Sequence, residues 1–164
     1  MIALFYKLLN KDVPYYARYP VWLILYKPIR KFINVTIIPN IPFSKIRVSS
    51  YRLLGYKIGK DVFIGMKCYL DDMEPSKTII EDNVVISYGC YFAVHGRRQS
   101  HTPIIIRKNS YIGMRSTLIS GKKGIEIGEG AIIGACSLVN KSIPAGTTAV
   151  GIPVRIIKEA AVSE

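Results

Sequence analysis

The chain has 164 residues, 49% of them apolar, which is enough for one domain with a buried core. The three cysteines lack the close paired spacing of a zinc knuckle and only two histidines accompany them, so a structural metal site is not expected. The net charge of +12 is uneven, because residues 1–60 carry 11 basic side chains and one acid, Asp12, whereas residues 61–164 are almost balanced. Two segments with different roles are therefore expected.

Residues 1–57 are expected to form a basic, aromatic-rich helical arm. Helical patterns cover three ranges: 1–10, 20–34 and 44–55. Three prolines are expected to interrupt the first two: Pro14, Pro20 and Pro28. The last pattern begins at Ser44, a residue type that caps helices, and stops at Gly55, so it should lead into the next segment.

Basic and aromatic side chains mix within the arm: Tyr19, Trp22, Tyr26, Lys27, Arg30 and Lys31. This mixture is typical of a membrane interface, and packing against the rest of the chain or a neighbouring copy is an equal alternative. No secretory signal is visible, so the cytoplasm is the expected location, at the inner face of the membrane if the arm binds lipid. No nucleic-acid-binding motif accompanies the charge, and no nucleic-acid partner is expected.

From Ile58 onward, twelve large apolar residues recur every six positions: Ile58, Ile64, Leu70, Ile80, Ile86, Phe92, Ile106, Ile112, Leu118, Ile127, Ile133 and Val139. A second column of small residues follows the same period: Val62, Cys68, Val84, Cys90, Ser110, Ser116, Ala131 and Ser137. A period of six fits neither a helix nor a simple strand, but it fits a coil with three flat faces. The pattern predicts an all-β solenoid of about four coils over residues 58–147, followed by a C-terminal tail, 148–164.

The repeat breaks at three loops, and the longest, residues 93–103, contains both histidines. Histidine titrates near neutral pH, so His95 is the candidate general base and His101 the alternative. His95 lies three residues after the core residue Phe92, which should fix its backbone better than that of His101 in mid-loop. The adjacent Arg97 and Arg98 are candidate substrate-binding residues for an anionic acceptor.

The repeat resembles that of the hexapeptide-repeat family. Residues 127–146 and the following Gly151-Ile152-Pro153-Val154-Arg155 are similar to the last coil and closing motif of its sugar and xenobiotic O-acetyltransferases. Arg155 stands where those relatives usually have lysine. The resemblance implies a left-handed parallel β-helix, a homotrimer with active sites between neighbouring copies, and acetyl-CoA as co-substrate without a metal.

The resemblance also implies residue roles. The base of those relatives lies in the long loop after the second coil, which matches His95, although theirs usually lies slightly later and precedes proline, as His101 nearly does. Backbone amides near Gly113 and Met114 are expected to stabilise the oxyanion. The implied coenzyme-binding positions are Gly113, Met114, Gly134, Ala135, Gly151, Pro153 and Arg155.

The expected reaction moves an acetyl group from acetyl-CoA to a hydroxyl of a sugar or of a polysaccharide or glycolipid precursor. A γ-type carbonic anhydrase, which uses the same fold, is disfavoured because its zinc needs three histidines and this chain has two. The remaining alternative is a non-enzymatic trimeric scaffold or membrane-binding β-helix protein.

Overall fold

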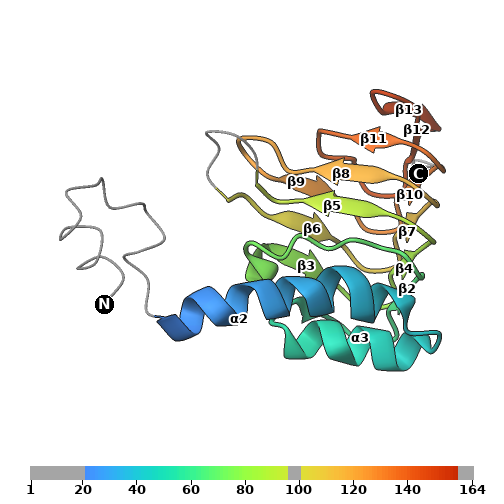
Figure 1. Ribbon diagram of the computed structural model, residues 1–164. Helices are drawn as coiled ribbons and strands as arrows, with labels where there is room; N and C mark the ends of the chain where they lie inside the picture. The colour runs from blue at the N-terminus through green and yellow to red at the C-terminus, as the bar shows by residue number, and fades with distance from the viewer. Residues whose placement is uncertain (1–20, 96–100, 159–164) are drawn as a thin grey trace, which may run out of the picture.

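The computed structural model describes residues 21–95 and 101–158, and it consists of a helical end and a stack of β-coils (Figure 1). The helical end contains α2 (Val21–Phe32), η2 (Ile33–Ile37), η3 (Ile38–Asn40) and α3 (Ser44–Leu53). The coils rise from these helices toward β13 (Figure 1). None of the described helices has the length and apolar character needed to cross a membrane.

Three sheets form the walls of the solenoid. Sheet A contains β1 (Lys57–Ile58), β3 (Thr78–Ile80), β6 (Ile104–Ile106) and β9 (Ile125–Ile127). Sheet B contains β2 (Phe63–Ile64), β4 (Val85–Ile86), β7 (Tyr111–Ile112), β10 (Ile132–Ile133), β12 (Thr148–Val150) and β13 (Arg155–Lys158). Sheet C contains β5 (Tyr91–Ala93), β8 (Thr117–Ile119) and β11 (Leu138–Val139). Every pairing is parallel except that of β12 with β13.

The chain passes from sheet A to sheet B to sheet C in each coil, and equivalent residues stack on one another. The register joins Ile58 to Ile80, Ile80 to Ile106, and Ile106 to Ile127. Eleven of the twelve predicted large residues are buried, and the exception, Ile58, packs against the core from the first coil. The solenoid predicted from the six-residue period is confirmed. Residues 148–158, expected as a tail, add β12 and β13 to sheet B.

The small-residue column lies at the tight turns between sheets. Seven of its eight members are buried, and the exception, Val62, packs against the core. Ser110 and Ser116 donate their hydroxyls to the carbonyls of Gly128 and Gly134, so these buried polar groups are satisfied. At Gly113, an added Cβ would lie 2.5 Å from the backbone nitrogen of Ala135, so no larger residue fits this turn without displacing the next coil.

The arm covers the first coil and departs from two expectations. Helix α3 is preceded by Phe43 and has no side-chain cap, so the prediction of a Ser44 cap is wrong: Ser44 already has helical geometry. Helix α2 continues through Pro28 rather than breaking there. Gly55, at φ +98°, follows the end of α3 as predicted.

Candidate active site

The candidate base lies where the chain leaves sheet C. The imidazole of His95 follows β5 and donates an Nδ1 hydrogen bond to Oδ2 of Asp71. The Asp71 side chain is fully buried, whereas that of His95 is 41% exposed. A carboxylate that holds Nδ1 fixes the ring orientation and leaves Nε2 as the nitrogen available to a substrate.

Asp71 is itself held by the backbone. Its Oδ2 accepts the N–H of Val94 at 2.8 Å, and its Oδ1 accepts the N–H of Met73 at 3.0 Å. Three donors around one buried carboxylate satisfy the charge that burial would otherwise make costly. The Val94 carbonyl also accepts the N–H of Thr102 at 3.2 Å, so the residue before His95 is fixed on both sides.

The sequence prediction did not include Asp71. It belongs to the first coil, and the bridge between Tyr69 and Tyr91 places its segment directly beside the strand that leads to His95. The usable signal was an acidic residue about one coil before the histidine, at the equivalent exit from sheet C. That signal requires knowing the stacking register of the loop.

The arm contacts the same segment from the other side. Asn34 Nδ2 donates to the Leu70 carbonyl at 2.7 Å, and Arg30 donates to the carbonyl of Asp72. The Tyr56 hydroxyl lies 2.9 Å from the Leu70 carbonyl, 3.1 Å from that of Asp71 and 2.9 Å from Oδ1 of Asn34. Burial raises the pKa of the Tyr56 phenol, so this hydroxyl remains a donor.

His101, the alternative base, has a looser environment. Its ring centroid lies 6.0 Å from that of His95, and its Nδ1 lies 3.9 Å from Oε2 of Glu74, beyond hydrogen-bond distance. This nitrogen is buried and has no hydrogen-bond partner within the described part of the chain. Arg97 and Arg98 lie outside the described residues.

The positions implied for the coenzyme lie at the turns from sheet B to sheet C, which we call the B–C corners. The N–H of Gly113 donates to the Ile133 carbonyl at 2.8 Å, and the N–H of Gly134 donates to the Ala149 carbonyl at 2.9 Å. The following amides, those of Met114 and Ala135, donate to no group within residues 21–95 and 101–158. They are the donors that these stacked corners leave for a ligand.

The remaining implied coenzyme positions continue this stack. Gly151 and Pro153 occupy the turn after β12, and Arg155 begins β13; all three are exposed. Gly151 N–H donates to the Ser137 hydroxyl at 3.1 Å.

Base and amide donors lie at different corners of one chain. His95 leaves sheet C at its far edge, and Met114 precedes the near edge, so strand β8, three residues long, separates the two corners. Three extended residues span about 10 Å, too far for both groups to act on one carbonyl carbon.

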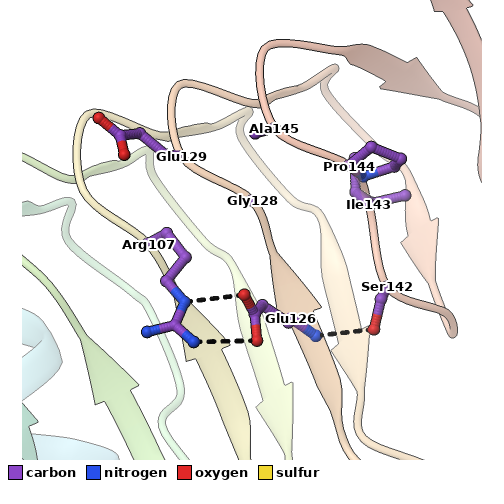
Figure 2. A pocket seen from close by; sticks show the side chains of 8 residues that line it. All are labelled: Arg107, Glu126, Gly128, Glu129, Ser142, Ile143, Pro144 and Ala145. Atoms are coloured by element: carbon purple, nitrogen blue, oxygen red, sulfur yellow. Dashed lines mark hydrogen bonds and ion pairs between the residues drawn. The ribbon is translucent and has the colours of Figure 1, made fainter.

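A hollow of about 640 Å³, whose lining residues are drawn in Figure 2, contains neither group. Arg107 makes two hydrogen bonds to Glu126, at 2.8 and 3.1 Å, and a third to Glu81 at 2.7 Å. The hydrogen bond from Arg107 lowers the pKa of the Glu126 carboxyl, so both partners stay charged and neutralise each other. The lining residues of this hollow include no histidine, and Arg107, the cation among them, is paired with carboxylates.

No group of three metal-ligating side chains lies together within the described ranges.

The family model described as the hexapeptide repeat of succinyl-transferase matches residues 56–92 and 103–141. A putative acetyltransferase of Bacillus subtilis, YvoF, is 30% identical over 135 residues, which cover 80% of this chain and 77% of the relative. The chain belongs to the hexapeptide-repeat acetyltransferases. The predicted family and enzyme class are confirmed.

Other similar proteins are acetyltransferases as well. The galactoside O-acetyltransferase of Escherichia coli is 30% identical over 118 residues, covering 63% of this chain and 57% of that protein. The chain thus spans little more than half the length of this relative. A soybean serine acetyltransferase, solved with serine, is 29% identical with a TM-score of 0.54, covering 62% of this chain and 40% of that one.

A hexapeptide-repeat acetyltransferase from Vibrio cholerae has a TM-score of 0.68 at 21% identity, covering 84% of this chain and 92% of that chain. A second structure of the Vibrio cholerae protein contains acetyl-CoA. These likenesses show the fold, and the predicted left-handed parallel β-helix with an N-terminal helical arm is confirmed.

Proposed function

We propose that this acetyltransferase moves the acetyl group of acetyl-CoA to a hydroxyl of a saccharide, with His95 as general base. The observation that carries the proposal is the hydrogen bond between His95 Nδ1 and the buried carboxylate of Asp71. A hydroxyl is a weak nucleophile until its proton is removed as it attacks. An oriented Nε2 on an exposed ring can remove it.

The reaction then balances without a covalent enzyme intermediate. His95 Nε2 takes the hydroxyl proton while the oxygen attacks the thioester carbonyl carbon, forming the C–O bond. The carbonyl oxygen becomes an oxyanion, for which the N–H of Met114 from a neighbouring copy is the proposed donor. The C–S bond breaks as the oxyanion collapses, and the imidazolium returns the proton to the coenzyme sulfur.

The proposal includes a homotrimer, the assembly that the family resemblance implies. His95 and Met114 lie at opposite edges of sheet C within one chain, so a copy beside His95 must supply the amide. The coenzyme would lie along the stacked B–C corners of that copy: Gly113, Met114, Gly134, Ala135, Gly151, Pro153 and Arg155. Arg155 is exposed and basic, which suits a coenzyme phosphate.

The acceptor class is supported by the relatives. The Escherichia coli relative is named a galactoside O-acetyltransferase, and a Clostridium difficile maltose O-acetyltransferase shares the fold with a TM-score of 0.65. A sugar hydroxyl, in a free saccharide or in a polysaccharide or glycolipid precursor, is the proposed acceptor. Arg97 and Arg98, beside His95 in sequence, are the proposed contacts for an anionic acceptor.

A thiol-release assay tests the proposal. The full chain is incubated with acetyl-CoA and a panel of galactosides, maltose and serine, and both free thiol and acetylated product are measured. We expect thiol release that depends on a sugar, with an acetyl ester on that sugar. Thiol release with serine alone would show that the acceptor is an amino acid and not a sugar. A stable trimer without turnover on any acceptor would support the scaffold function instead.

A further inference from the structure

The arm has an inner and an outer side. On the inner side, Arg30 and Asn34 donate hydrogen bonds to the first coil, and Arg47 is buried against it. Eight large apolar side chains of the arm are instead between 41% and 89% exposed: Tyr26, Ile29, Phe32, Val35, Ile37, Phe43, Ile46 and Leu53. We call these eight residues the apolar arm surface. Single exposed hydrophobics need no explanation, but this many within 28 residues of sequence indicate an interaction surface.

The charged side chains of the arm itself are almost all basic, although Asp61 of the first coil lines a hollow together with Lys45 and Arg52. The sequence contains no acidic residue between Asp12 and Asp61. Exposed basic residues accompany the apolar ones through this stretch: Lys31, Lys45, Arg52 and Lys57. The solenoid differs, because there Arg107 pairs with Glu81 and Glu126, and Lys108 lies 3.3 Å from Glu129. The described part of the arm therefore offers exposed apolar side chains beside exposed cations, and it contains no acidic residue.

The exposed apolar side chains and the positive charge of the arm together indicate the kind of partner. A symmetric contact between two such surfaces would bring Lys31, Lys45 and Arg52 of both copies together, with Asp61 as one carboxylate beside them. An anionic bilayer fits both properties, because apolar side chains can be buried at the boundary of its acyl chains and its phosphates can pair with Lys and Arg. Helix α2 has 12 residues, so it can lie in the interface plane but not cross it.

We propose that the apolar arm surface docks this protein on an anionic lipid bilayer. Tyr26, Ile29 and Phe32 of α2 enter the boundary between headgroups and acyl chains. Lys31 and Lys45 extend their charged ends to lipid phosphates. The docking is independent of the acetyl transfer proposed above, since none of these side chains contacts Asp71 or His95 in the described structure.

Vesicle co-sedimentation of the full chain tests the proposal. Phosphatidylcholine vesicles are compared with mixed phosphatidylcholine and phosphatidylglycerol vesicles at low and high salt. We expect binding to the mixed vesicles only, weakened by salt because the phosphate contacts are screened. Equal binding to both lipids would overturn the proposal, and so would binding to neither.

Matched variants test the surface itself. Ile29→Ser with Phe32→Ser removes two exposed apolar side chains from the arm, and Ile156→Ser with Ile157→Ser removes two from β13 at the opposite end of the solenoid. We expect the arm pair to lower vesicle affinity roughly tenfold to a hundredfold and the β13 pair to leave it unchanged. Equal effects of the two pairs would contradict the proposal.

Two further measurements distinguish lipid docking from contact between copies of the chain. Lys31→Glu with Lys45→Glu should weaken binding to mixed vesicles more than Lys122→Glu with Lys123→Glu, two exposed lysines of the solenoid. Sedimentation velocity without lipid should show the same mass for the Ile29→Ser, Phe32→Ser protein as for the unmodified chain. A lower mass would show that the surface joins copies of the chain, and the membrane proposal would be wrong. Unchanged thermal melting confirms that the variants are folded.

Discussion

The solenoid and the arm satisfy backbone hydrogen bonds by different means. Each coil of the solenoid pairs with the next mainly through backbone hydrogen bonds between parallel strands, which serine hydroxyls supplement at the turns. The first coil has no coil beneath it, and the arm supplies side-chain donors there: Tyr51 to the Cys68 carbonyl, Arg47 to Ile64, and Asn34 to Leu70. The arm thus closes an open end of the repeat, as terminal caps do in other solenoids.

The comparison shows where the candidate catalytic residues lie in an otherwise regular fold. Repeated coils give repeated environments, and none of them places a carboxylate beside an imidazole. Asp71 and His95 both lie where the chain leaves sheet C and the six-residue period is interrupted. The arm then holds the Asp71 segment through Asn34 and Tyr56. The candidate site combines two interruptions of the repeat with several contacts from the arm.

The largest expected effect is that of His95→Ala. Turnover should fall by about two to four orders of magnitude, the usual contribution of a positioned base, because no other described group is oriented to take the proton. Affinity for acetyl-CoA, measured by calorimetry, should change little, since the proposed coenzyme contacts lie at the B–C corners. His101→Ala should be milder, because its Nδ1 has no hydrogen-bonded carboxylate in the described structure. An inactive His101→Ala protein beside an active His95→Ala protein would reverse this assignment.

Next in size is Asp71→Asn. An amide cannot accept from the ring and from two backbone amides as a carboxylate does, so the imidazole should lose its fixed tautomer and orientation. We expect turnover to fall by roughly one to three orders of magnitude, less than for loss of the base itself. The adjacent Asp72→Asn is the control, because that carboxylate accepts from the Tyr69 hydroxyl at 2.8 Å and does not contact His95. Comparable losses in both variants would show that the Asp71 contact has no special role.

The sequence could predict the solenoid because each coil repeats the same physical requirement. A large apolar residue must fill each face and a small residue must fit each corner. The same requirement therefore recurs many times from Ile64 to Val139, which makes the pattern visible in the sequence. The loops and the arm offer no such repetition. Asp71 could be paired with His95 only after the stacking of the two coils was known, and Tyr56 only after the arm was docked. The helix through Pro28 was missed because local propensity was weighed without the contacts of Arg30 and Asn34.

A smaller effect is expected for Tyr56→Phe, which tests whether the arm positions the site. The change removes a buried hydroxyl near the carbonyls of Leu70 and Asp71 and should cost about 1 kcal/mol of stability. Tyr51→Phe removes a similar buried hydroxyl, 3.0 Å from the Cys68 carbonyl, and should cost about the same. Only Tyr56→Phe should lower kcat, by about threefold to tenfold with KM for acetyl-CoA unchanged, because only its hydroxyl lies beside the Asp71 segment. Equal kcat in the two variants would make Tyr56 a purely structural residue.

The mildest test changes no residue and asks whether solenoid and arm open together. Cys136 is exposed, whereas Cys68 and Cys90 are free, buried thiols, as the small-residue column predicts. The hydrogen bond with Cys68, together with burial, raises the pKa of the Cys90 thiol, which keeps it in the unreactive form. A bulky thiol reagent should therefore modify Cys136 at once and the other two only after opening, as followed by mass spectrometry of peptides.

Cys68 lies in the coil that the arm covers, with its carbonyl near the Tyr51 hydroxyl, and Cys90 lies one coil further on. If the arm separates first, Cys68 should be modified before Cys90; if the two regions unfold as one unit, their rates should match. Rapid native-state modification of both would show that the stacking register is wrong.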